Sequence, residues 1–198
     1  MRFRWSGGIG LVLGMLSVEP AMAAEADWPC VQRRVVDLSV AQMWAGPEID
    51  PQASRWRDDQ DVAPLARSLA SRRMSLDAAG AAIEHFANAA GQEKDAKLTL
   101  LFAGIFELIN TERHRIINGI ERYARKQKSL ADQISEASRI LRQDNKSTPE
   151  RAALEQKLQW DTRIYDDRNQ ALTYVCDSPV ILEQRVYSLS QEIARQLN

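Results

Sequence analysis

The sequence contains few of the residues from which most catalytic and metal sites are built. Among 198 residues there are two histidines, His85 and His114, and two cysteines, Cys30 and Cys176. The Glu-x-x-His pair of di-iron bundles, the HExxH zinc motif and the CxxCH haem-attachment motif are all absent, as are GxSxG and a glycine-rich phosphate loop. The sequence therefore predicts no metal, no cofactor and no catalytic residue, and we interpret the chain as a non-enzymatic protein.

The sequence also lacks an apolar run long enough to span a membrane, which takes about 20 residues. The strongest candidate is the short run Ile9–Val18. Arg2 and Arg4 precede this run and Ala21-Met22-Ala23 follow it, a pattern typical of a cleaved secretory signal. We predict that residues 1–23 are removed on export and that the mature chain does not insert into a membrane. An uncleaved N-terminal anchor is the alternative interpretation.

A strong charge imbalance is missing as well. The whole chain carries 26 Lys and Arg against 27 Asp and Glu, and removal of the predicted signal leaves 24 and 26. A net charge so close to zero gives no long-range attraction to nucleic acid or to anionic lipid. We therefore expect no nucleic-acid partner.

The two cysteines fit a structural disulfide. In an exported protein an even pair most simply forms one bridge, whereas a redox-active pair needs a CxxC spacing that the sequence does not have. A Cys30–Cys176 disulfide would fasten the N-terminal segment to the last helix. Export combined with one disulfide favours a periplasmic location, and a secreted destination fits the same features.

The segment around which the rest of the chain is organised is Asp95–Gln143, which has no proline and, apart from Gly104 and Gly119, no glycine. Its apolar residues recur at alternating steps of four and three, which is the heptad pattern of a coiled coil. Such a helix would run roughly 75 Å, so it needs a partner along its side. The predicted contact line comprises Phe102, Phe106, Ile109, Arg113, Ile116, Ile120, Tyr123, Gln127, Leu130, Ile134, Ala137 and Leu141.

The partner is predicted to lie in the same chain, after a polar break at about 144–149. Thr148 is a favoured N-cap residue and Pro149 suits the first helical position. Pro179 falls on the second contact line, so the helix either kinks there or restarts with Ser178 as its cap. The two lines predict an all-α fold, a helical bundle with a long antiparallel coiled-coil hairpin whose tip is the polar break. The second line comprises Leu154, Leu158, Asp161, Tyr165, Arg168, Leu172, Val175, Pro179, Leu182, Val186, Leu189 and Ile193.

The rest of the mature chain is predicted to form a strap and two short helices. Residues 24–56 are interrupted by prolines and glycine, and we interpret them as a partly irregular strap held by three tryptophans, the alternative being an aromatic binding platform. Residues 57–198 form the helical bundle, in which helices at 57–71 and 76–90 pack on the first third of the long helix. Its apolar stripe narrows beyond Gly119, so we expect the hairpin to project. The alternative is a compact bundle in which the short helices cover the hairpin.

Arg113 stands on the contact line where an apolar residue is expected. A buried arginine usually pairs with a carboxylate, and Glu183 is a candidate. The alternative is that the guanidinium binds an anionic ligand in the bundle.

A second polar group is predicted near the middle of the hairpin. Folding the chain about its tip brings Tyr123 and Gln127 close to Asp161 and Arg168. Polar residues on a contact line commonly fix the register of the helices. The alternative is a small-ligand or enzymatic pocket, located either here around Tyr123 and Arg168 or around Arg113.

The length of the hairpin carries the functional hypothesis, because a projecting arm exceeds what the folding of a small domain requires. The leading interpretation is an exported helical protein that binds other proteins of the cell envelope, as an adaptor, a scaffold or a chaperone-like protein, with a homodimer as one possible form. The predicted interaction face lies on the outside of the hairpin and comprises Arg125, Lys128, Asp132, Glu136 and Arg163.

Overall fold

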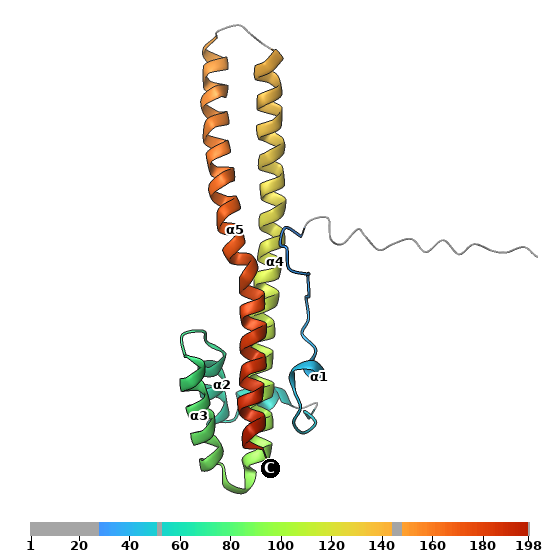
Figure 1. Cartoon of the computed structure of the whole chain (residues 1–198), viewed down its shortest axis with the longest axis vertical. Helices are drawn as coiled ribbons and strands as arrows, with labels where there is room; N and C mark the ends of the chain where they lie inside the picture. Colours follow the sequence, from blue (N-terminus) through green and yellow to red (C-terminus); the bar gives the residue numbers. More distant parts are fainter. Residues whose placement is uncertain (1–27, 51–52, 144–147, 198) are drawn as a thin grey trace, which may run out of the picture.

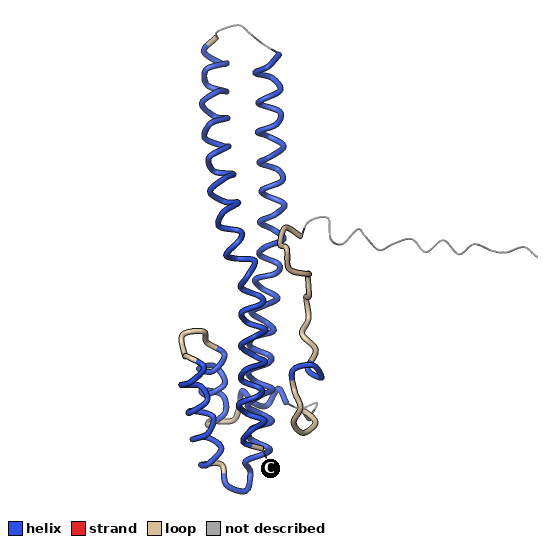
Figure 2. Tube along the Cα trace, in the orientation of Figure 1, coloured by secondary structure: helices blue, strands red, loops and turns tan. Residues whose placement is uncertain are grey.

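The computed structural model describes residues 28–50, 53–143 and 148–197, and every regular element in these ranges is a helix (Figures 1 and 2). The predicted all-α hairpin bundle is therefore confirmed. The predicted signal, residues 1–23, lies outside the described residues, as does most of the predicted tip. The elements in chain order are α1 (Val40–Met43), the 3-10 helix η1 (Ala53–Arg57), α2 (Val62–Ala70), α3 (Leu76–Ala89), the 3-10 helix η2 (Gly91–Glu93), α4 (Lys94–Gln143) and α5 (Pro149–Gln196).

Two long helices form the frame of the molecule. Helix α4 has 50 residues and α5 has 48, and they run antiparallel along each other (Figure 1). The start of α5 is set by local chemistry, because Thr148 accepts a hydrogen bond from the backbone N–H of Arg151 and Pro149 occupies the first turn. Ser75 caps α3 in the same way, through the N–H of Ala78. Within the described residues, no helix is both long and apolar enough to cross a membrane.

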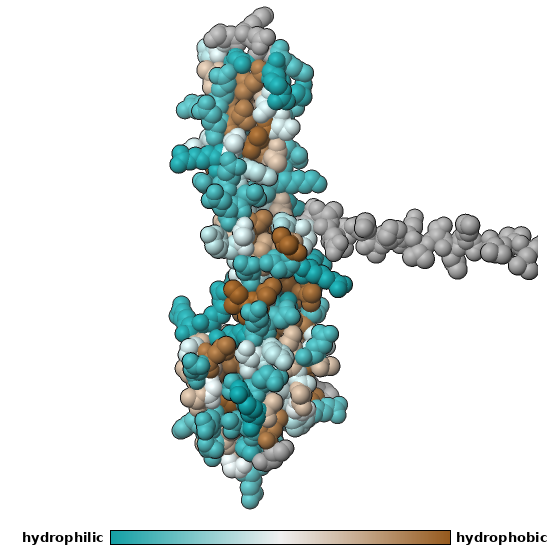
Figure 3. All heavy atoms as spheres, viewed as in Figure 1, coloured by the Kyte–Doolittle hydropathy of each residue, from teal (hydrophilic) through white to brown (hydrophobic). Residues whose placement is uncertain are grey.

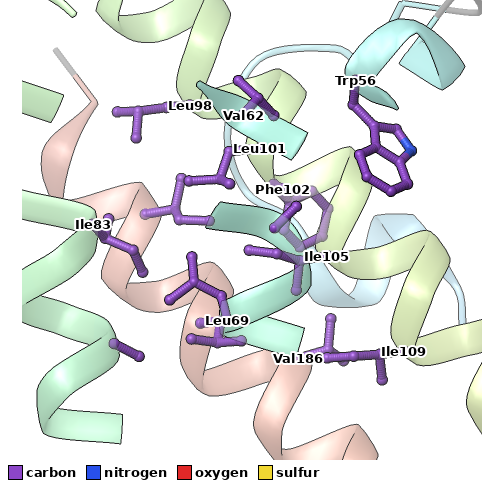
Figure 4. Packing of buried hydrophobic residues seen from close by; sticks show 14 of the residues in the cluster. Trp56, Val62, Leu69, Ile83, Leu98, Leu101, Phe102, Ile105, Ile109 and Val186 are labelled. Atoms are coloured by element: carbon purple, nitrogen blue, oxygen red, sulfur yellow. The ribbon is translucent and has the colours of Figure 1, made fainter. Parts of the chain in front are cut away.

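The hydrophobic core lies at one end of the hairpin, which we call the base: α1, η1, α2, α3 and the parts of α4 and α5 that pack against them. The first third of α4 is apolar on more than one face because it meets α2, η1 and α5 at once. Trp44 stacks on Phe102 with ring centroids 4.2 Å apart, and the indole of Trp56 is buried. Figure 4 shows the centre of this packing, which includes Trp56, Val62, Leu69, Ile83, Leu98, Leu101, Phe102, Ile105, Ile109 and Val186.

The other end of the hairpin projects away from the base. Helices α2 and α3 lie beside the lower part of α4 and α5 only, and the upper part has no other described element next to it (Figure 1). We call residues 124–143 of α4 and 149–167 of α5 the distal arm. Of the two arrangements considered from the sequence, the hairpin takes the projecting one.

The N-terminal strap, residues 28–50, runs along the hairpin and is bonded to it. Cys30 and Cys176 form the predicted disulfide, with an S–S distance of 2.02 Å. This bridge packs with Trp28 on a small apolar cluster that includes Ile120 and Leu172. The strap is largely irregular, with α1 as its single helical turn before the gap at 51–52.

Helix α5 continues through Pro179 without a break. Proline removes one backbone hydrogen bond and crowds the preceding turn, and Figure 1 shows α5 changing direction in its middle part. The apolar line stays in phase beyond the proline, where Leu182, Val186, Leu189 and Ile193 are all buried. The restart at Ser178, considered from the sequence, does not occur.

Candidate interaction surface

The distal arm is held by its two helices alone and buries little. Among its described residues, Gln127 alone is buried, with 7% of its surface exposed. Each helix of the arm has a single packing partner, so only the face toward that partner is covered and the other faces are in contact with water. In Figure 3 an apolar strip is visible along the arm between hydrophilic flanks. The half-buried apolar residues of the arm include Leu130, Ile134, Ala137, Leu141, Leu154 and Leu158.

Two polar side chains of α4 reach across to the backbone of α5 near the lower end of the arm. The hydroxyl of Tyr123 donates to the carbonyl oxygen of Arg168 at 3.0 Å, and Nε2 of Gln127 donates to that of Tyr165 at 3.1 Å. Asp161 instead pairs with Lys157 one turn away on its own helix. Tyr123 thus lies beside Arg168, as predicted, and the two bonds across the hairpin run from side chains of α4 to main-chain carbonyls of α5. Such bonds fix the register of the hairpin.

Arg113 is buried where α4, α5 and the strap meet, with 2% of its surface exposed. Its Nε donates to the carbonyl oxygen of Pro179 at 3.2 Å, and its Nη2 and Nη1 donate to those of Val35 and Val36 at 3.1 and 3.4 Å. Glu183, the carboxylate expected from the sequence, lies 3.5 Å from Nη2. The guanidinium therefore ties three segments together.

Burial lowers the pKa of Arg113, while the carboxylates of Glu183 and Asp37 act in the opposite direction. The guanidinium nevertheless stays charged at neutral pH, because arginine titrates far above it. A charged group buried to this degree needs the carbonyls and the carboxylate that surround it.

The residues predicted as an interaction face lie on the surface of the distal arm. Nη2 and Nε of Arg139 donate to the two carboxylate oxygens of Glu136 at 2.6 and 2.8 Å, which lowers the pKa of the Glu136 carboxyl. This pair is local to one turn of α4 and joins no other element. All five predicted residues are exposed: Arg125, Lys128, Asp132, Glu136 and Arg163.

The structure adds one residue that the heptad analysis did not single out. Trp160 lies on the outer face of α5 with 63% of its surface exposed, and it lines a shallow depression together with Gln156 and Arg163. It stands two positions after the contact-line residue Leu158, so its spacing already places it away from α4. Tyr174, two heptads further along the same face, is 77% exposed.

Within the described residues, no three His, Cys, Asp or Glu side chains are grouped so that they could hold a metal ion. Comparisons of the chain with family models, with curated proteins and with solved structures found no match.

Proposed function

We propose that this chain is an exported binding module of the periplasm whose distal arm docks on another protein of the cell envelope. The observation that carries the proposal is Trp160, a large aromatic side chain that is mostly exposed on an arm outside the core. Covering the exposed part of an indole is worth roughly 3 kcal/mol at about 25 cal/mol per Å². Tryptophan and arginine are the residues most enriched at the energetic centres of interfaces, and Arg163 lies beside Trp160.

The compartment in this proposal rests on the disulfide and on the sequence of residues 1–23. The Cys30–Cys176 bridge is compatible with an oxidising compartment. An N-terminal signal with one structural bridge fits the periplasm, where such bridges persist.

The alternative of a small-ligand pocket around Arg113 or Tyr123 receives less support from the contacts. The donors of Arg113 are directed at three backbone carbonyls and at Glu183, and the Tyr123 hydroxyl is directed at the backbone of α5. These groups are engaged in joining elements of the fold. The arm, by contrast, offers side chains that the fold does not use.

The experiment is site-specific photo-crosslinking in cells. A photo-reactive residue placed at Gln156, which lines the same depression as Trp160, is expected to capture one defined envelope protein, and Trp160→Ala is expected to abolish that capture. Tyr174→Ala is the matched control, because it removes an exposed aromatic from the same helix face nearer the base. Equal loss with Tyr174→Ala, or capture unaffected by Trp160→Ala, would show that the arm does not anchor the partner.

A shortened arm gives an independent test. Deleting 128–141 and 151–164 removes two heptads from each helix, preserves the heptad phase, and keeps both the Gln127–Tyr165 contact and the cap at Thr148 and Pro149. We expect this variant to fold and, in a pull-down after general chemical crosslinking of lysines in cells, to lose the partner that the unshortened chain captures. Sedimentation of the unshortened protein shows whether the chain is a monomer or a homodimer in solution. If the crosslinking captures only a second copy of the same chain, docking on a different protein is contradicted.

A further inference from the structure

A groove at the base, far from the distal arm, contains features that neither the fold nor the proposed docking uses. It lies between α5 and the turn that joins α2 to α3, and its volume is about 470 Å³. Its lining includes two arginines, Arg72 and Arg185, and no acidic residue. Three apolar or aromatic side chains on its rim are about half exposed: Leu76 at 44%, Ile181 at 44% and Tyr187 at 52%.

Arg185 is the unusual member of this lining. Only 8% of its surface is exposed, and its Nε donates to the carbonyl oxygen of Leu69 at 2.8 Å, in the last turn of α2. Its Nη2 is buried and has no hydrogen-bond partner within the described part of the chain. The edge of the guanidinium that carries Nη1 and Nη2 is therefore the edge left for another acceptor.

The charge of Arg185 is poorly balanced by the protein. Burial lowers its pKa, and no carboxylate acts in the opposite direction, in contrast to Arg113 with its Glu183 and Asp37. The C-terminal end of α2 supplies only about half a negative charge. A buried cation without a full counter-charge is costly to a fold, so an anion beside Arg185 would be favourable.

Arg72 adds a second positive charge at the rim of the groove. It is exposed, and it lies close enough to Glu112 to lower the pKa of that carboxyl. Glu112 itself is held by two bonds from Arg115, at 2.8 and 2.7 Å, so its charge is already matched. The lining of the groove consequently combines positive charge with apolar surface.

We propose that this groove binds a small amphipathic carboxylate, a molecule with an apolar chain that ends in –COO⁻. The planar carboxylate matches the free edge of the Arg185 guanidinium and is within the field of Arg72. The chain lies on Leu76, Ile181 and Tyr187, where it covers apolar surface that is otherwise in water. Since Nη2 has no accessible surface without the ligand, a rim side chain has to move, and the half-exposed Leu76 and Tyr187 have room to do so.

The test uses octanoate as the probe, titrated into the full mature protein by calorimetry. Octanoate is expected to bind, while octanol, which has the same chain without the charge, and acetate, which has the charge without the chain, bind about tenfold or more weakly. Amide shifts in nuclear magnetic resonance spectra are expected at Leu76, Ile181 and Tyr187. Equal binding of octanol, or no binding of octanoate, would overturn the proposal.

Variants locate the site. Arg185→Met is expected to weaken octanoate binding about tenfold or more, whereas Arg163→Met, which removes an exposed arginine of the distal arm, leaves it unchanged. Folding is checked by circular dichroism. If Arg185→Met does not fold, Arg72→Gln and Tyr187→Ser take its place, and both must weaken octanoate binding for the proposal to stand. Loss of binding in Arg163→Met equal to that in Arg185→Met would refute the assignment.

Discussion

Two glycines of α4 provide a matched test of how η1 and α2 pack on the long helix. A methyl group added at Gly104 would lie 2.8 and 3.1 Å from atoms of the Trp56 ring and 3.1 Å from Cβ of Ala66. A methyl group added at Gly119 would meet nothing closer than the end of the Arg122 side chain, at 3.9 Å. Both substitutions improve helix propensity by about 1 kcal/mol, because alanine loses less backbone entropy than glycine.

The two positions differ in what the new methyl group displaces. The Trp56 ring is held in place, since it is 2% exposed, its Nε1 donates to Glu107 Oε2 at 3.0 Å, and the guanidinium groups of Arg57 and Arg67 lie over it at 4.9 and 5.8 Å. Overpacking of this kind costs about 1–3 kcal/mol. We therefore expect Gly119→Ala to raise the free energy of unfolding by about 1 kcal/mol and Gly104→Ala to lower it by about 1 kcal/mol.

The assay is equilibrium unfolding in guanidinium chloride, followed by helical circular dichroism, with wild type and both variants measured side by side. The predicted separation between the two variants is about 2 kcal/mol, equivalent to a difference in Tm of about 4–8 °C for a chain of this size. Near-ultraviolet circular dichroism reports the environment of Trp56 and is expected to change in Gly104→Ala only. If Gly104→Ala proves as stable as Gly119→Ala, Trp56 does not pack on this part of α4 as described.

Three further predictions concern the disulfide, the buried Arg113 and the Glu112–Arg115 pair within α4. Replacing Cys30 and Cys176 by alanine releases a bridge between residues 146 positions apart, and calorimetry is expected to show a loss of up to about 5 kcal/mol on the chain-entropy account. Arg113→Met removes the guanidinium from three backbone carbonyls, of which that of Pro179 takes part in a buried bond and those of Val35 and Val36 in part-buried ones, so denaturant unfolding is expected to show a loss of about 2–4 kcal/mol. The pKa of Glu112 is lowered by Arg115, so its contribution to stability is present above pH 4.5 and is lost as the pH falls below that value; Glu112→Gln should flatten this part of the stability profile in acid titrations of unfolding.

The frame of the fold could be predicted from the sequence because its signals are local. The absence of proline and the heptad spacing predicted a helix over Asp95–Gln143, and α4 runs Lys94–Gln143. The single possible cysteine pairing predicted the bridge, and Pro149 marked the first turn of α5. The helix bounds depend on residues within a few positions of each other, and two cysteines allow only one intramolecular pairing.

The prediction of which residues lie on the contact line was less accurate at the base. The heptad pattern placed Ile116 on the line, but Ile117 is the more buried of the two, at 1% exposed. An α-helix has 3.6 residues per turn, and where it meets several partners its buried face follows that period and not the 3.5 of a two-helix contact. Sequence spacing alone does not say where the number of partners changes.

The partners of the polar side chains were the least predictable part of the candidate sites. Arg113, Tyr123 and Gln127 all donate to backbone carbonyls, and every residue has a carbonyl, so composition gives no sign of which one is used. Trp160 is exposed because no other described element lies beside the arm, and the sequence of α5 does not show this. The unpaired Nη2 of Arg185 depends on which carboxylates end up nearby. These are properties of the assembled fold.

The continuity of α4 and α5 has a mechanical consequence. The two helices run unbroken from the base to the arm and are joined by bonds from Arg113, Tyr123 and Gln127, so sliding one past the other by a single residue, about 1.5 Å, would break all three. Tilting the arm breaks none of them, and no other described element stands in its way. A sideways force on the distal arm is therefore passed to the base as a tilt of both helices together, and not as sliding of one helix along the other.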